Sequence, residues 1–179
     1  QWTAFTDLTS LPATAFSDLS ELENPIVAMH ALRPTSGAVL ADGAQYLALA
    51  QPGTNATAFA FILVDRQPGP VGPAAVCNGP EGTCYYFGSD YNLYRFDGST
   101  AQVVAFLSWL IQASIITINY QSLSSVSMVY VPQTQDILIA IPTETQGVPS
   151  TIFAYNILTQ QVNIWRYATT NQISSLGLW

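Results

Sequence analysis

The chain of 179 residues is long enough for one domain with a substantial core, or for part of a larger one. Its net charge of −7 argues against a nucleic-acid-binding protein, because phosphate contacts need clustered Lys and Arg, and this chain has only four arginines and no lysine. Only 8% of the residues are charged, against about 25% in an average soluble domain, so we expect a surface of Ser, Thr, Gln and Asn, or one buried against other subunits.

Residues 1–24 mix Thr, Ser, Ala and acidic residues with isolated apolar ones. Ser17 to Glu21 has the pattern of a short helical turn, with Ser17 as its cap and acidic residues near its start. The segment lacks the basic start and continuous apolar run of a signal peptide. We therefore expect an irregular N-terminal arm or connecting segment that packs on another surface.

Short apolar runs bounded by Pro, Gly, Asn or Asp predict a β-strand region over residues 25–66. The predicted strands are 26–32, 45–50 and 58–64. The Asp42-Gly43 pair predicts a tight turn, because Gly adopts positive φ at little cost.

Residues 67–82 are dense in Pro and Gly, which remove hydrogen-bond donors and weaken ordering. We expect a long exposed loop here, acting as a hinge or a contact loop. Cys77 and Cys84 bracket a Gly/Pro-rich stretch, and either a disulfide or two unpaired thiols fits that spacing. A zinc site is not expected, because two cysteines and the distant His30 supply too few ligands.

Residues 83–179 predict a propeller-like β region. The predicted strands are 83–87, 93–96, 125–131, 136–141, 151–155 and 161–167. The last four follow one another through short connections, which makes the antiparallel meander that one propeller blade requires. Both faces of the last two strands carry bulky side chains, which suits a sheet between neighbouring sheets. The predicted fold class is therefore all-β, with antiparallel meanders that form propeller-like blades.

The most apolar stretch is 103–118. It falls short of the roughly 20 apolar residues that a membrane-spanning helix needs, and Gln112 interrupts it. We expect core or interface here and no membrane span.

No catalytic constellation is evident in the sequence. His30 lies within an apolar run, and no nucleophile motif such as Gly-x-Ser-x-Gly accompanies it, which favours a structural histidine. Most aspartates occur in turn contexts, where they cap their own backbone. These aspartates are Asp42, Asp65, Asp90, Asp97 and Asp136. We therefore expect a protein that is not an enzyme and has no cofactor or metal site.

Aromatic residues are concentrated between Tyr85 and Phe96 and again near the C-terminus. The first group could line a sugar-binding groove, but in a strand-rich chain we expect most of it to be core. The candidate interface or packing residues are Tyr94, Phe96, Trp109, Tyr155, Trp165 and Tyr167.

Three segments carry a resemblance to a known group of proteins. They read FGSDYNLYRFDGS at 87–99, YVPQTQDILIAIP at 130–142 and YNILTQQVNIW at 155–165. Their order resembles the β-propeller part of the tail nozzle or hub proteins of short-tailed bacteriophages, where a hairpin ending in Phe-Asp-Gly-Ser precedes a blade. The resemblance covers about residues 82–167.

The resemblance implies a structural protein of the phage virion tail. It implies a sixfold ring of copies around a DNA conduit, contacts with neighbouring virion tail proteins, and no enzymatic role. The alternative is a secreted, extracellular carbohydrate-binding β-propeller or adhesin. The tyrosine-rich strands, the cysteine pair and the low charge favour that alternative.

Overall fold

The computed structural model describes residues 24–50, 59–113, 115–143 and 147–167, together with Ile173 and Leu176. The predicted N-terminal arm, apart from Asn24, lies outside the described residues. The described chain is all-β and consists of three four-stranded antiparallel sheets with few helices, so the predicted all-β class is confirmed. No closed propeller is formed by this part of the chain.

The first sheet has the strand order β1-β2-β3-β4, with neighbouring strands antiparallel. Its strands are β1 (Ile26–Arg33), β2 (Ser36–Ala41), β3 (Ala44–Ala50) and β4 (Phe59–Asp65). The predicted turn at Asp42-Gly43 is confirmed, because Gly43 has a φ of 77° between β2 and β3. Strand β2 was not predicted, since its first residues are small and follow Pro34 closely.

The second sheet has the order β5-β6-β7-β8. Its strands are β5 (Val76–Asn78), β6 (Cys84–Phe87), β7 (Leu93–Phe96) and β8 (Ala101–Ala105). The prediction of an irregular, exposed loop over 67–82 is wrong for β5, which pairs with β6 and has Val76 and Cys77 buried. Gly69 in this segment is buried too, and a Cβ there would clash with the backbone of Ala41.

The third sheet has the order β12-β11-β10-β9. Its strands are β9 (Ser127–Val131), β10 (Asp136–Ile141), β11 (Thr151–Asn156) and β12 (Val162–Arg166). The predicted four-stranded meander is confirmed here, with strand ends within two residues of those expected.

The connection between the second and third sheets contains one short α-helix and a 3-10 helix. These are α1 (Ser108–Gln112) and η4 (Tyr120–Ser125), and a further 3-10 turn, η3 (Pro80–Gly82), joins β5 to β6. Within the predicted core stretch 103–118, Leu107, Leu110 and Ile116 are buried, so that prediction is confirmed for them. No helix in the described ranges has both the length and the apolar character needed to cross a membrane.

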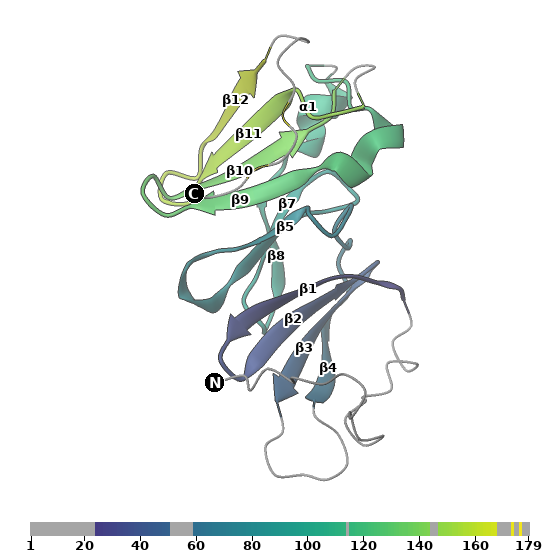
Figure 1. The fold of residues 1–179 in the computed structure, drawn as a ribbon, viewed down its shortest axis with the longest axis vertical. Coiled ribbons are helices and arrows are strands. Elements are labelled where there is room, and N and C mark those ends of the chain that lie inside the picture. Colours follow the sequence, from purple (N-terminus) through teal and green to yellow (C-terminus); the bar gives the residue numbers. More distant parts are fainter. Residues whose placement is uncertain are drawn as a thin grey trace, which may run out of the picture.

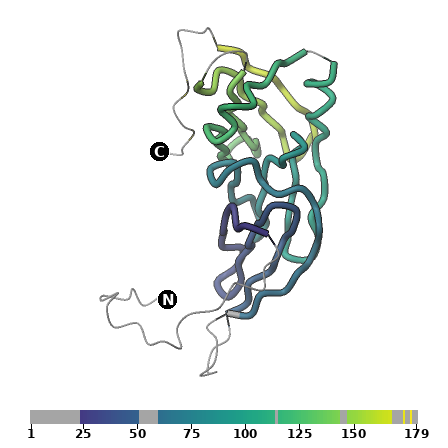
Figure 2. Tube along the Cα trace, turned by 90° about the vertical axis from the view of Figure 1, so that its right-hand side faces the viewer, coloured from purple at the N-terminus to yellow at the C-terminus, as the bar shows by residue number. Residues whose placement is uncertain are grey.

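The three sheets are stacked along the long axis of the molecule in chain order (Figure 1), and the order is the same in the view turned by 90° (Figure 2). They approach one another through their first strands. Strand β1 lies next to β5, and β5 lies next to β9. Hydrogen bonds also join neighbouring sheets. Among them, Ala101 N donates to Asp65 Oδ2 over 3.0 Å, and Met128 N donates to the Ala74 carbonyl over 2.9 Å.

The second sheet is buried on both faces, because side chains alternate between the two faces of a strand. One face packs on the first sheet through Tyr86, Tyr94 and Phe96, which meet Leu32 and Leu40. The other face packs on the third sheet. That second core includes Tyr85, Phe87, Leu93, Ile137, Ile139, Phe153 and Tyr155.

Removal of one large side chain from either core should destabilise the whole stack. We expect Phe96→Ala and Phe153→Ala each to lower the free energy of unfolding by about 3–5 kcal/mol, because both rings are fully buried. Leu158, 75% exposed in the turn between β11 and β12, is the control. Leu158→Ala should stay within about 0.5 kcal/mol of the wild type in denaturant titrations. A small effect at either phenylalanine would contradict the two shared cores.

Candidate interaction site

The six aromatic residues singled out in the sequence divide into two groups. Three are buried in the cores between sheets: Tyr94 is 2% exposed, Phe96 0% and Tyr155 3%. The other three are exposed on the surface: Trp109 is 54% exposed and Trp165 and Tyr167 are each 42% exposed. The first group therefore consists of packing residues, with Tyr94 and Phe96 in one core and Tyr155 in the other, and of these six only the second group is exposed to a partner.

The aromatic rings of β6 and β7 are buried, so the expectation that most aromatic residues between Tyr85 and Phe96 belong to the core is confirmed. Tyr86 and Tyr94 stack on each other, with ring centroids 5.0 Å apart and planes at 6°. The Tyr94 hydroxyl donates to Asp90 Oδ2 over 2.8 Å, and burial raises the pKa of both phenols. An open sugar-binding groove, the alternative, would need these rings at the surface, so they do not form one.

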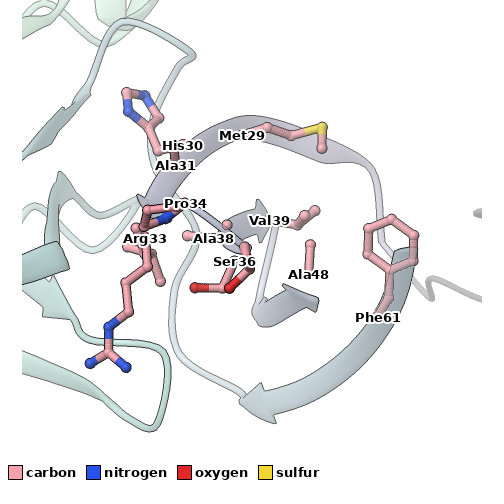
Figure 3. Close-up of a pocket in the computed structure, with 13 residues that line it drawn as sticks. Met29, His30, Ala31, Arg33, Pro34, Ser36, Ala38, Val39, Ala48 and Phe61 are labelled. Carbon is pink, nitrogen blue, oxygen red and sulfur yellow. The ribbon is translucent and has the colours of Figure 1, made fainter. Parts of the chain in front are cut away.

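A hollow of about 450 Å³ is lined by the first sheet, mostly by β1, β2 and the turn between them. Its floor is a row of small residues that the strand register places side by side: Ala31 opposes Gly37, and Gly37 opposes Ala48. Met29 and Phe61 form its walls, with Val39 between them (Figure 3). Figure 3 also shows the His30 imidazole and the Arg33 guanidinium pointing away from these apolar side chains.

A second cleft, of about 420 Å³, is lined by residues of the first two sheets and has a different character. Arg33, Glu81, Arg95 and Asp97 all line it, in a chain with only four arginines. Two positive and two negative groups give this cleft no preference for an anion or a cation. Asp97 already accepts hydrogen bonds from Ser99 and Thr100, and the bond from the Ser99 hydroxyl contributes most to lowering its pKa.

The single histidine and the side chains of Asp65, Asp90, Asp97 and Asp136 make structural contacts. His30 Nδ1 lies 3.2 Å from Asn78 Oδ1 and so joins β1 to β5. Asp65 accepts from Arg66 N, Asp90 from Asn92 N and Asp136 from Asn156 Nδ2. No group of three His, Cys, Asp or Glu side chains suited to a metal ion occurs among the residues that the structure covers. The absence of an enzymatic role stays a prediction.

Comparison with protein-family models finds no match for this chain, and comparison with curated proteins finds none either. The resemblance to phage tail proteins is therefore an expectation from the three sequence segments alone.

The two cysteines are free and buried, and they lie on opposite faces of the second sheet. Cys77 is opposite Tyr85 and packs in the core shared with the third sheet. Cys84 is opposite Asn78 and packs in the core shared with the first sheet. A disulfide requires Cβ atoms that point toward each other, so this register does not allow the bond that the spacing left open. Of the two alternatives, the structure has the two unpaired thiols.

We predict that both thiols are unreactive in the folded protein. Burial raises the pKa of each to about 12, with the nearby Cys84 adding to the shift of Cys77, so almost no reactive thiolate forms at pH 8. A maleimide should label neither cysteine at pH 8 without denaturant and both after unfolding. Leu158→Cys, at an exposed position, should gain one fast-reacting thiol. A mass increase on reduction of the untreated protein would reveal a disulfide and contradict the assignment.

The hollow was missed from the sequence. Met29, Ala48 and Phe61 belong to three different strands, and nothing in their local context distinguishes them. The available signal is the strand pattern itself, since small residues at alternating positions of adjacent strands leave a depression once the strands are paired.

Proposed function

We propose that this chain is a structural component of a phage virion tail, of the nozzle or hub type, which forms a ring around the DNA conduit through contacts between copies. The observation that carries the proposal is the adjacency of β1, β5 and β9 in three successive four-stranded meanders. In a propeller, four-stranded blades stand around a central channel. Blades arranged in this way must follow one another in chain order and meet through corresponding strands, as the three sheets do here.

The distribution of charge also supports a role in permanent contacts. Only 8% of the residues are charged, and Met29 on the first sheet is 59% exposed. Large exposed apolar side chains occur elsewhere in the described residues as well, among them Ile62, Leu63, Phe106, Trp109 and Tyr120. Obligate subunit interfaces are more apolar than transient ones, and charged residues are depleted at their centres.

One observation favours the second candidate, a carbohydrate-binding protein. Trp109 in α1 is 54% exposed, and Phe106 and Tyr120, which come before and after α1 in the chain, are 66% and 57% exposed. Exposed aromatic rings offer stacking surfaces for sugars. If this is the function, a glycan array should give binders that are lost in Trp109→Ala, whereas the absence of any binder at millimolar glycan would remove this candidate.

Mass photometry and negative-stain imaging of the 179-residue chain test the proposed ring. We expect a particle mass that is a fixed multiple of the chain mass, and images with an open centre. Because the proposed contacts are apolar, the particle should persist in about 1 M salt, where the Debye length is only about 3 Å. A chain that stays monomeric at every concentration, or particles that dissociate in salt, would contradict the proposal.

A further inference from the structure

The outward face of the third sheet is buried at its centre, although it belongs to neither core between sheets. Ile139 on β10 and Phe153 on β11 pack in the core shared with the second sheet. Because side chains alternate along a strand, their neighbours Ala140 and Ile152 lie on the opposite, outward face. These two side chains are nevertheless only 0% and 5% exposed. A buried row on an end sheet indicates that another part of the chain covers it.

The strand register places the buried residues in one row across the sheet. Ala140 is opposite Ser127 on β9 and also opposite Ile152 on β11. Ile152 is in turn opposite Trp165 on β12. Ser127, Ala140 and Ile152 are each at most 8% exposed, whereas Trp165 is 42% exposed. The cover therefore lies over β9, β10 and β11 and leaves the β12 end of the row open.

Backbone hydrogen bonds place the chain that follows β12 along this row. Strands β12 and β9 form the two edges of the third sheet. Beyond β12, Ile173 N donates to the Pro149 carbonyl, just before β11, over 3.0 Å. Leu176 N donates to the Ser127 hydroxyl at the beginning of β9 over 3.3 Å. The chain thus passes from the β12 edge to the β9 edge, a distance of about 14 Å at about 4.8 Å per strand.

We propose that the segment containing Ile173 and Leu176, here called the C-terminal strap, occupies the outward face of the third sheet and closes that end of the stack. Both residues are apolar and half-buried, as expected if they cover Ala140 and Ile152. The strap takes the place that a further sheet would take. This inference does not rest on the proposed function, because a chain that never forms a ring would carry the same strap.

The occupant of this face is a segment of the same chain rather than a second copy. Ala140 and Ile152 are already buried within a single copy, and the two hydrogen bonds of Ile173 and Leu176 are also made within it. Without the strap, the apolar row would lie on the surface, and exposed apolar patches favour association. Contacts between unlike surfaces that do not close into a ring give open filaments. The strap therefore protects this end of the stack from uncontrolled growth.

Hydrogen exchange of the unmodified chain, measured residue by residue by NMR, tests the strap. The amide hydrogens of Ile173 and Leu176 should exchange at least about tenfold more slowly than in an unfolded chain, because both are hydrogen-bonded. Ser127→Ala removes the acceptor of Leu176, so protection should fall at Leu176 and persist at Ile173. Exchange of both amides at the rate of an unfolded chain would overturn the inference.

Thiol labelling measures whether the strap covers the row. The probe is Ile152→Cys, in a background of Cys77→Ala and Cys84→Ala. Adding Leu176→Asp should displace the strap, since a charge is costly to bury, and should speed maleimide labelling at pH 8 at least about tenfold. Leu158→Asp makes the same change at a site that is 75% exposed and should leave the rate within about twofold.

Circular dichroism checks that each labelled variant is folded, and the exchange measurement needs no variant if one of them is not. Equal labelling rates in the Leu176→Asp and Leu158→Asp chains would mean that the strap does not cover Ile152, which overturns the inference. Mass photometry of the unmodified chain reports on the ring separately. A monomeric chain with protected amides at Ile173 and Leu176 would therefore contradict the proposed ring and support the strap.

Discussion

Burial of the second sheet on both of its faces is the constraint on which the rest of the structure depends. Tyr86, Tyr94 and Phe96 belong to the core shared with the first sheet, and Tyr85, Phe87 and Leu93 belong to the core shared with the third. Each of these side chains is at most 3% exposed. At about 25 cal/mol per Å² of apolar surface removed from water, rings of this size stabilise both junctions strongly. The chain therefore behaves as one stack rather than three independent sheets.

Backbone and polar contacts fix the alignment that these cores allow. The side chain of Gln45 is fully buried and bonds to Gln67 in both directions, with distances of 2.9 and 3.0 Å, so the segment that leaves β4 is held on the first sheet. The Asp65 carboxylate accepts a hydrogen bond from the Ala101 amide of β8. Hydrogen bonds to a charged acceptor are among the stronger ones in proteins. The bond between Ala101 and Asp65 therefore helps to fix which strands of the first and second sheets meet. The outward faces at the two ends of the stack follow from this alignment.

The sequence predicted the parts of the fold in which local pattern and tertiary structure agree. In the third sheet, apolar runs of five to six residues end at Pro, Asn or Gln turns, and each run became a strand. Strand β5 could not be predicted, because three residues in a Pro/Gly-rich segment form a strand only when β6 offers them a partner. The register of β5 and β6 also decides on which face of the second sheet Cys77 and Cys84 each lie. The hollow required the pairing of Ala31, Gly37 and Ala48, which lie on three consecutive strands and come side by side only through the register of β1, β2 and β3.

The central claim is that successive sheets meet through their first strands, and engineered cysteines on β1 and β5 measure this directly. The His30 and Asn78 side chains touch across the first junction, so His30→Cys with Asn78→Cys, in a background of Cys77→Ala and Cys84→Ala, places two thiols within the span of a short bifunctional thiol cross-linker. The account predicts that such a linker joins the two cysteines within one folded chain, and that it does not join Leu158→Cys to Asn78→Cys. Failure of the linker to join positions 30 and 78, with both thiols reactive, would mean that the first and second sheets do not meet in this way.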